Sequence, residues 1–412
     1  MVILKRDRDL EKIKKLGQWV YICGRRKTGK TFMVRRFLDY DAYYFVNRDR
    51  TLFTEEGRKI SYEAFFEIFR ESVGKKKIVI DEMHRLPDEF FDFLHSTGRV
   101  GEVIAISSTL WLSEKLLGTG SPLLGLFSMY ILGLVDQCDV LSSLPGENPV
   151  EDLKAAVYLR EPILAMDYRA PIEDYLSNYL YGNRLAVNEI IGEIFSEEQR
   201  RTSQVYLGIL KSISAGKRKS GEISSFLFSR KLIPKDNPGA IQKHLEVLQK
   251  MGLIEKIESS RRGFYYMHRS PLFNIHFYLD EKYGYVETDV PKKYIEEVVR
   301  EMMPEEIERF VWDLLSRKLG LKKVKIEEPE IDIALKRFSR IAMVGEVKWR
   351  ENITDGQIRK IEEKLSKFNA KMVIVVPDKR ELMSPKDAVL LDARDLIEIC
   401  KDKSEVLEEI AV

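Results

Sequence analysis

The first chemical signal of the sequence is a glycine-rich segment close to its start. Residues 24–31 read GRRKTGKT and match G-x-x-x-x-G-K-[ST] at every fixed position. An apolar run of strand length, residues 19–23, precedes them, and an amphipathic stretch at helical spacing, residues 32–38, follows. In that context backbone N–H groups can surround phosphate oxygens, and the helix start adds positive potential. A glycine turn before a surface helix is the alternative, and the strand–loop–helix order argues against it.

Each residue of this loop has a predicted part in holding a nucleotide. Lys30 would reach the β- and γ-phosphates, and Thr31 would ligate Mg²⁺. The other six would bind the phosphates, and they are Gly24, Arg25, Arg26, Lys27, Thr28 and Gly29. The segment therefore predicts a site for ATP with Mg²⁺.

A second segment supplies the acids that such a site needs. Residues 78–82 read IVIDE, so a β-branched run ends in Asp81 and Glu82. A buried parallel strand delivers side chains in this way to its C-terminal edge. Asp81 would hold Mg²⁺ through water, and Glu82 would be the general base that polarises the attacking water. Two acids after a strand can also form a solvated turn, so the assignment depends on the phosphate loop.

The next predicted strand, residues 103–107, also ends in polar side chains. Ser108 follows it and would contact the γ-phosphate or the attacking water. The alternative is that this serine caps the helix predicted at 111–117. We interpret His84 as a loop residue rather than a catalytic one.

A second group of chemically capable residues lies near the end of the chain. Asp332 falls in the strand-like segment EIDIA, and Glu346 and Lys348 fall in the strand-like segment MVGEVKW. Glu346 and Lys348 are two residues apart, so they share one face of their strand. Two carboxylates and a lysine can bind a divalent metal and activate water for phosphodiester cleavage. A surface salt bridge among the three side chains is the alternative.

The surrounding elements predict four parts of the chain. Strands alternating with helices over residues 1–148 predict a parallel α/β sheet of the P-loop NTPase kind. Helical patterns over 149–200 would form a lid on the nucleotide. Residues 201–290 show three short helices and a hairpin, the order of a winged helix-turn-helix, and residues 291–412 show a second α/β pattern. The strands expected in the first part are residues 19–23, 43–46, 78–82, 103–107 and 129–135.

Positive charge is concentrated in the middle of the chain, although the net charge is only +2. Residues 201–270 carry 14 Lys and Arg against 5 Asp and Glu. Such a cluster is typical of a nucleic-acid surface, and a solvated basic face is the common alternative. The side chains placed to contact DNA are Gln242, Lys243, Lys250, Arg261 and Arg262. We therefore predict DNA as a partner, while noting that many winged helices contact only proteins.

Length and composition set the class of the protein. At 412 residues two to four domains are expected, and 44% hydrophobic residues exclude a disordered chain. The charged fraction of 33%, rich in Lys and Glu, is a feature of hyperthermophile proteins. No signal-peptide core opens the sequence, and its most apolar stretch, residues 122–135, is too short to span a bilayer. We predict a cytoplasmic protein without a membrane partner.

The three cysteines, Cys23, Cys138 and Cys400, lie far apart in the sequence. They show no spacing typical of metal or redox sites. We interpret them as reduced, mostly buried thiols, as expected in the cytosol.

The motifs of the first half resemble those of archaeal P-loop ATPases of the AAA+/STAND type. The resemblance rests on residues 24–31, 78–82, 107–109 and the element SPLLG at 121–125. Members of that family typically follow this element with an arginine, and Leu126 stands in that place here. Other candidates for an arginine contact are Arg99, Arg160 and Arg169.

The last part is similar to the PD-(D/E)XK nuclease superfamily, whose core is a helix, three strands, a helix and a strand. The resemblance implies a restriction-endonuclease-like α/β domain in which Lys348 is catalytic. It also implies that Mg²⁺ or Mn²⁺ is bound by Glu308, Asp332 and Glu346. Archaeal ATPases of the kind named above often carry such a domain.

Two hypotheses follow for the function. The leading one is an ATP-hydrolysing enzyme that engages DNA through residues 201–270 and carries a metal-dependent nuclease-like domain. The other is a nucleotide-dependent switch that binds DNA or protein partners without cutting, and Leu126 in the arginine position favours it. The acids of the last part favour the first hypothesis. A homo-oligomer is compatible with both.

Overall fold

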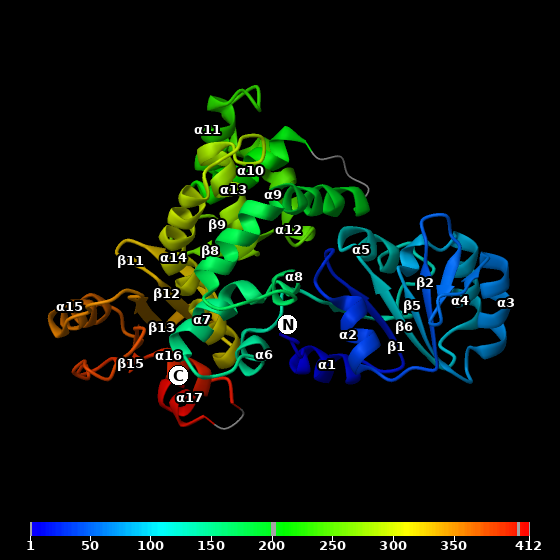
Figure 1. Ribbon diagram of the computed structural model, residues 1–412, viewed down its shortest axis with the longest axis horizontal. Coiled ribbons are helices and arrows are strands. Elements are labelled where there is room, and N and C mark those ends of the chain that lie inside the picture. Colours follow the sequence, from blue (N-terminus) through cyan, green and yellow to red (C-terminus); the bar gives the residue numbers. More distant parts are fainter. Residues whose placement is uncertain (1, 199–202, 402–403, 412) are drawn as a thin grey trace.

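The computed structural model describes residues 2–198, 203–401 and 404–411. Figure 1 shows two bodies side by side, which we call the first body (residues 2–134) and the second body (residues 135–411). Each is built around one β-sheet, of seven strands in the first and eight in the second. The boundary predicted between residues 200 and 201 lies outside the described residues.

The sheet of the first body has the order β4-β3-β2-β5-β6-β1-β7. Its parallel strands are β1 (Trp19–Cys23), β2 (Ala42–Val46), β5 (Lys77–Asp81), β6 (Glu102–Ser107) and β7 (Ser128–Ile131). These are the five strands expected from the sequence, with small differences at their ends. Because β6 lies between β1 and β5, the phosphate loop, the acid pair and Ser108 all leave the sheet at one edge.

The prediction of a wholly parallel sheet is wrong at one edge. Beyond β2, β3 (Leu52–Thr54) and β4 (Lys59–Ile60) form an antiparallel hairpin. Only residues 47–51 connect β2 to β3, and a parallel crossover needs about a dozen residues or more, so the chain reverses. Arg50 and Gly57 supply left-handed backbone in the two turns, with φ of 64° and 78°.

Helices cover both faces of this sheet, so its central strands are buried on both sides. On one face Met33 packs near Ile22, and on the other Phe65 belongs to the core that contains Tyr21. The helices are α1 (Asp7–Lys14), α2 (Lys30–Phe37), α3 (Tyr62–Ser72), α4 (Asp88–Thr97) and α5 (Trp111–Leu117).

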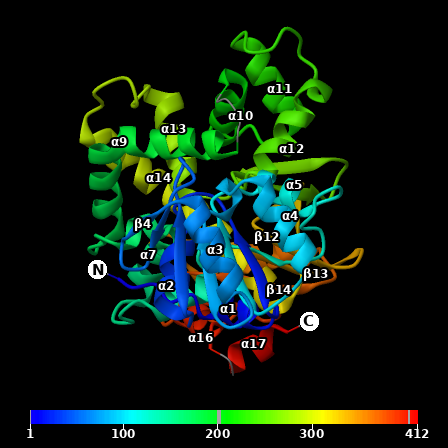
Figure 2. The same cartoon turned by 90° about the vertical axis from the view of Figure 1, so that its right-hand side faces the viewer.

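The segment predicted as a lid is helical and belongs to the second body. Its helices are α7 (Pro149–Leu159), α8 (Pro162–Ala165) and α9 (Ile172–Glu197). The preceding helix α6 (Gln137–Ser142) falls in the range 1–148 predicted as the ATPase core, yet it packs in the core of the second body. Leu153 and Leu176 lie in the same hydrophobic core as the rest of the second body. Asn183 has non-helical φ and ψ inside α9, and Figure 2 shows the helix bent, with one arm reaching over the first body.

Helices and a hairpin occupy the region predicted as a winged helix-turn-helix. They are α10 (Gln204–Ser214), α11 (Ser220–Ser229), the 3₁₀ turn η2 (Pro238–Ile241), α12 (Gln242–Lys250), β8 (Ile254–Ser259) and β9 (Phe264–His268). The hairpin is not isolated, because β8 pairs in parallel with β10 (Lys322–Glu327). At its tip the Ser260 backbone N–H donates to the Lys325 carbonyl at 2.8 Å. Segments on both sides of the predicted 290/291 boundary therefore share one sheet.

The last part contains the expected order of a long helix, strands, a helix and a strand. These elements are α14 (Lys292–Leu319), β10, β11 (Glu330–Ile331), β12 (Ile333–Arg337), β13 (Arg340–Val347), α15 (Asp355–Leu365) and β14 (Lys371–Val375). Four further elements complete the second body, namely α13 (Pro271–Tyr283), β15 (Val389–Leu391), α16 (Ala393–Glu398) and α17 (Glu405–Ile410). The sheet order is β15-β14-β13-β12-β10-β8-β9, with β11 on β10. Since α14 packs against α9, β10 and β12, it joins the lid to this sheet.

The interpretation of three reduced cysteines is wrong for two of them. Cys138 of α6 and Cys400, just after α16, form a disulfide across 262 residues of sequence. Because α16 packs on α6 and α7, the Cα atoms of the two cysteines lie 5.0 Å apart. The spacing of the cysteines in the sequence does not reveal this proximity. Cys23 in β1 is buried and free.

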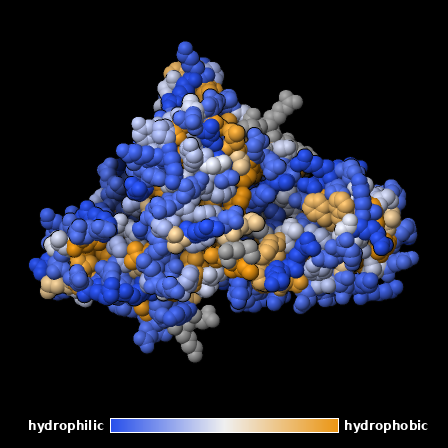
Figure 3. Space-filling model, in the orientation of Figure 1, coloured by the Kyte–Doolittle hydropathy of each residue, from blue (hydrophilic) through white to orange (hydrophobic). Residues whose placement is uncertain are grey.

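Within the described residues, no helix has both the length and the apolar character that a membrane crossing requires. The face in Figure 3 is largely hydrophilic, with apolar side chains in patches. Large exposed apolar side chains include Leu124 and Phe338, which lie in two separate turns.

Candidate nucleotide site and carboxylate cluster

The phosphate loop turns sharply between β1 and α2. Gly29 and Lys27 adopt left-handed backbone, with φ of 84° and 66°. At Gly24 a Cβ would lie 2.2 Å from the carbonyl oxygen of Leu132, so only glycine fits there. The close approach at Gly24 and the turn at Gly29 explain why the pattern needs glycine at both places.

Arg6 holds the loop from the start of the chain. Its guanidinium donates to the carbonyl oxygens of Thr28, Gly133 and Leu134 at 2.5, 2.9 and 3.0 Å. The side chain is buried. Sequence reasoning missed Arg6, because nothing near it in the sequence indicates which carbonyl groups it meets.

Lys30 opens α2 and is buried in the loop. Its Nζ donates to the carbonyl oxygens of Gly24 and Arg25 at 2.7 and 2.9 Å. Burial lowers the pKa of Lys30 to about 8. A phosphate group beside the ammonium would favour its charged form.

The structure brings Thr31 and Asp81 together. The hydroxyl groups of Thr31 and Tyr43 donate to Asp81 Oδ2 at 2.6 and 2.8 Å. Asp81 Oδ1 is buried and has no hydrogen-bond partner among the described residues. Burial also raises the pKa of Asp81. A hydroxyl beside an unpaired carboxylate oxygen offers the oxygen ligands that Mg²⁺ accepts, so the residues present fit this ion.

Glu82 has a left-handed backbone, with φ of 59°, and precedes the 3₁₀ turn η1 (Met83–Arg85). Ser108 donates to Glu82 Oε2 from its backbone N–H at 3.2 Å and from its hydroxyl at 2.9 Å. His84 Nδ1 lies 3.3 Å from the same oxygen and 3.0 Å from Ser107 Oγ. His84 lies in the turn η1 beside the carboxylate of Glu82, and its interpretation as a non-catalytic residue stays a prediction.

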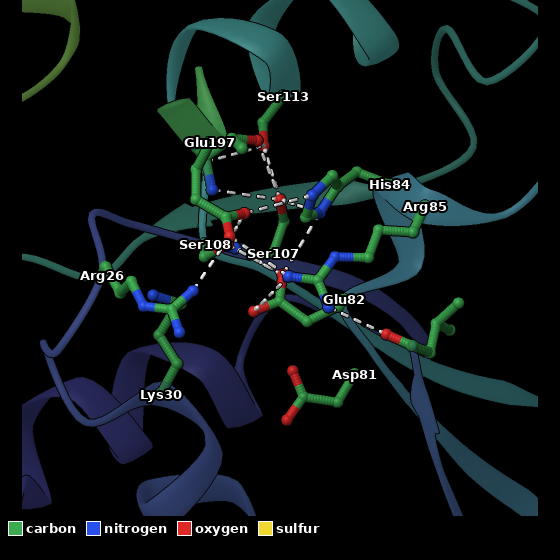
Figure 4. Close-up of polar contacts among 12 residues, drawn as sticks. Arg26, Lys30, Asp81, Glu82, His84, Arg85, Ser107, Ser108, Ser113 and Glu197 are labelled. Atoms are coloured by element: carbon green, nitrogen blue, oxygen red, sulfur yellow. Dashed lines mark hydrogen bonds and ion pairs between the residues drawn. The ribbon is translucent and has the colours of Figure 1, made fainter. Parts of the chain in front are cut away.

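Glu197, in the last turn of α9, also reaches this site (Figure 4). Its carboxylate accepts from Arg26 Nη1 at 2.9 Å and from Ser108 Oγ at 2.8 Å. Arg85 donates to it at 3.3 Å, and His84 Nε2 lies 3.7 Å away. The contact with His84, and then the hydrogen bond from Ser108, lower the pKa of Glu197 to about 2. Sequence reasoning missed Glu197, which lies 89 residues beyond Ser108.

An apolar pocket of about 290 Å³ adjoins the phosphate loop at Gly29. The start of the chain, α2 and α8 form its walls. Its apolar side chains include Val2, Leu4, Phe32, Met33, Pro162 and Ile163. A planar, largely apolar base fits such a pocket next to a phosphate site. Sequence reasoning missed it, and the apolar residues at the chain start were the available signal.

The arginines considered from the sequence lie elsewhere. Arg99 donates to two backbone carbonyls at the end of the SPLLG element. Arg160 is buried and donates to Asp313 at 3.4 Å, and Arg169 is exposed before α9. The arginines beside Glu197 are instead Arg26, Arg48 and Arg85.

The structure also assembles the acids of the last part. Asp332 accepts from the backbone N–H of Val347 at 2.9 Å. Lys348 Nζ lies 3.6 Å from Asp332 Oδ2 and 3.0 Å from Glu346 Oε2. Lys364 of α15, which sequence reasoning missed, donates to the other oxygen of Glu346 at 2.6 Å. Glu346 is 2% exposed, so this cluster is more than a surface salt bridge.

Glu308 of α14 joins this cluster. Burial, and then the charge of Asp332, raise the pKa of Glu308 to about 8. Burial and the charge of Glu346 raise the pKa of Asp332. Mutually repelling acids suit a divalent cation. In the described part of the chain their oxygens do not form a group of three within 4.8 Å of one another, so side chains would have to turn to share one ion.

Several side chains expected to contact DNA are engaged within the chain. Lys250, at the end of α12, lies 3.7 Å from Glu114 of the first body. Arg261, at the hairpin tip, pairs with Glu328. The exposed members of the predicted set include Gln242, Lys243 and Arg262. The C-terminal end of α12 therefore meets the first body.

Solved structures similar to this chain include a Walker-type ATPase of Pyrococcus abyssi. It is 18% identical, the match covers 67% of this chain and 96% of that chain, and the TM-score is 0.42. The Aeropyrum pernix ORC1 protein, solved in complex with DNA, is 13% identical, with 73% and 93% covered and a TM-score of 0.29. The Aeropyrum pernix ORC2 protein is 12% identical, with 72% and 91% covered and a TM-score of 0.36.

No curated protein matches the chain. Residues 17–123 match the AAA domain family. This range contains the phosphate loop, the acid pair and Ser108. Residues 17–123 therefore form an AAA-type domain.

Proposed function

We propose that the chain hydrolyses ATP at the edge of the first sheet. One arrangement carries the proposal: the phosphate loop, the Thr31–Asp81 pair and Glu82 converge beside an apolar pocket that suits a base. Binding, metal ligation and water activation are thus supplied within one site.

Each part of the site would have its own role in binding or hydrolysis. The apolar pocket would take the adenine, while the loop backbone and Lys30 would hold the triphosphate. Mg²⁺, held by Thr31 and Asp81, would neutralise charge on the β- and γ-phosphates. Glu82, hydrogen-bonded to Ser108, would orient the water for in-line attack and take its proton. Lys30 would stabilise the charge that develops on the transferred phosphoryl group.

Release of inorganic phosphate from ATP with Mg²⁺ tests this proposal. We expect turnover by the wild type and a loss of about 100-fold or more in Lys30→Ala, which removes the buried ammonium. Lys75→Ala, at an exposed position of the same body, is the matched control and should keep full turnover. The absence of turnover in the wild type, with and without DNA, would contradict the proposal.

We further propose that the second body engages DNA. The helices α10 to α12 and the hairpin β8–β9 would act as a winged helix, with exposed Lys243 and Arg262 on DNA phosphates. The surplus of positive charge over residues 201–270 supports this proposal. Binding should weaken with salt because phosphate contacts release counterions.

We also propose that the carboxylate cluster cleaves DNA. Glu308, Asp332 and Glu346 would hold Mg²⁺ or Mn²⁺, and the ion would activate water. Lys348 would stabilise the charge that develops on the scissile phosphate. The support is the contact of Lys348 with two carboxylates, one of them buried.

Cleavage of labelled single-stranded, duplex and branched DNA tests this step. The assay uses Mg²⁺ or Mn²⁺, with and without ATP. Cutting by the wild type, lost in Asp332→Ala and kept in the exposed control Asp387→Ala, would support a nuclease. No cutting under any condition would contradict it.

A nucleotide-dependent switch is the second candidate. The contact of Lys250 with Glu114 of the first body supports it, because a movement between the two bodies would change the exposed surface of α12. DNA binding that depends on the nucleotide, without cutting, would support the switch. Assembly into a homo-oligomer and a cytoplasmic location stay predictions.

A further inference from the structure

Glu197 is an acid in a site that takes a triphosphate. It belongs to α9 of the second body, and its side chain is only 8% exposed. Glu197 and Glu82 both accept from the Ser108 hydroxyl, at 2.8 and 2.9 Å. Two carboxylates that share one donor repel each other, so other groups must hold Glu197 in place.

Three guanidinium groups account for the position of Glu197. Arg26 of the phosphate loop and Arg85 donate to it at 2.9 and 3.3 Å, and Arg48 lies 3.8 Å away. Figure 4 shows Arg26 and Arg85 on either side of the carboxylate. Guanidinium groups and a hydroxyl around one oxyanion form an anion site, and a side chain fills it here.

A metal ion is the alternative explanation of this cluster. Glu82, His84 and Glu197 offer ligand atoms within 4.8 Å of one another. Glu197 already accepts from Arg26 and Arg85, however, and a cation would lie beside these positive side chains. The surroundings therefore favour an anion over a cation.

We propose that Glu197 competes with the γ-phosphate of ATP for the donors around it, and this inference rests on the ATP site proposed above. The donors are Arg26, Arg85 and Ser108. The γ-phosphate carries more charge and more acceptor oxygens than a carboxylate, so it takes the donors and releases the end of α9. ADP lacks this group and leaves the contact in place. Arg26 and Arg85 would then bind the γ-phosphate, and both belong to the same chain as the nucleotide site.

The release of the end of α9 from the first body would affect the rest of the second body. The next residue, Glu198, accepts from the backbone N–H groups of Leu110 and Leu112, so two acids dock the last turn of α9 on the first body. α9 packs along α14, and α14 carries Glu308 of the carboxylate cluster. A ligand shifts a conformational equilibrium only if it binds one of the two states more tightly. The γ-phosphate would do so, because it can contact the donors only in the state in which Glu197 has left them.

Calorimetric binding of a non-hydrolysable ATP analogue and of ADP to the full chain tests the inference. Glu197→Gln removes the competing charge, so it should raise the affinity for the analogue about tenfold and change that for ADP by less than about twofold. Arg85→Ala should lower the affinity for the analogue alone. Glu189→Gln removes one acid from an exposed position of α9 and should change neither affinity.

An unchanged ratio of the two affinities in Glu197→Gln, or an equal gain for ADP, would overturn the inference. Hydrogen exchange of the wild type adds a readout that needs no substitution. Amides at the end of α9 should exchange faster with the analogue than with ADP, and equal exchange would refute the release. A wild type that binds neither nucleotide would overturn the proposed ATP site itself, which separates the two failures.

Discussion

The guanidinium of Arg25, in the phosphate loop, pairs with the carboxylate of Glu161, just before α8, and both side chains are buried. Arg25 also lies over the ring of Phe273, with its Cζ 4.8 Å from the centroid. One loop side chain thus contacts two elements of the second body. Because Lys30 donates to the carbonyl of Arg25, a displacement of α8 would be transmitted to Lys30.

Loss of this pair should destabilise the protein. Glu161→Ala leaves the Arg25 charge buried without its partner, which costs about 3–5 kcal/mol of unfolding free energy. Denaturant titration measures this cost. Glu55→Ala, which breaks the exposed pair with Arg35, is the control and should cost less than about 1 kcal/mol. Similar costs for the two variants would argue against a structural role of the buried pair.

Glu82→Gln should separate nucleotide binding from hydrolysis. The amide keeps an acceptor for Ser108 but cannot take a proton from water, so kcat should fall about 10²–10⁴-fold. The affinity for ATP should change little, because Glu82 is not assigned to the phosphates. Steady-state turnover and equilibrium binding measure the two effects, with the exposed Glu102→Gln as the control. Full turnover in Glu82→Gln would exclude it as the base.

Local sequence patterns predict much of the first body, because residues close together in the sequence determine where a strand, a glycine loop or a helix forms. The Gly24 and Gly29 positions have the steric reasons that the pattern implies. Glu82 and Ser108 meet because parallel strands that are neighbours end at one edge of the sheet. The β3–β4 hairpin is harder to predict, since its strands are only a few residues long.

Contacts between distant segments are beyond such patterns. Glu197 reaches the candidate nucleotide site through the bend and packing of α9, and Lys364 reaches Glu346 through the packing of α15 on β13. The Cys138–Cys400 disulfide depends in the same way on helix packing. A single sequence does not specify the register between helices, so these partners are found only in the structure.

A charge in the apolar pocket should weaken the binding of ATP and ADP alike. Phe32 lines the pocket and is 52% exposed, so Phe32→Asp should fold and yet place a carboxylate against the base. Both affinities should fall by about tenfold or more, since burying an unpaired charge is costly. Phe53→Asp, at a comparably exposed position of β3, should leave them unchanged. Normal affinities in Phe32→Asp would place the base elsewhere.

Glu308 should make the protein less stable as the pH rises. Its pKa is raised from 4.5 to about 8, so between these values the folded chain holds a proton that the unfolded chain has released. The free energy of unfolding therefore declines with increasing pH across this range. Glu308→Gln has no such proton to lose, so its free energy of unfolding should decline less with pH. The stability of this variant relative to the wild type should therefore be greatest near pH 8. Denaturant titrations at several pH values without divalent metal measure this, and the exposed Glu297→Gln on the same helix is the control. Added Mn²⁺ should stabilise the wild type at pH 8 by binding the ionised acids, whereas parallel pH profiles of wild type and Glu308→Gln would show that Glu308 titrates normally.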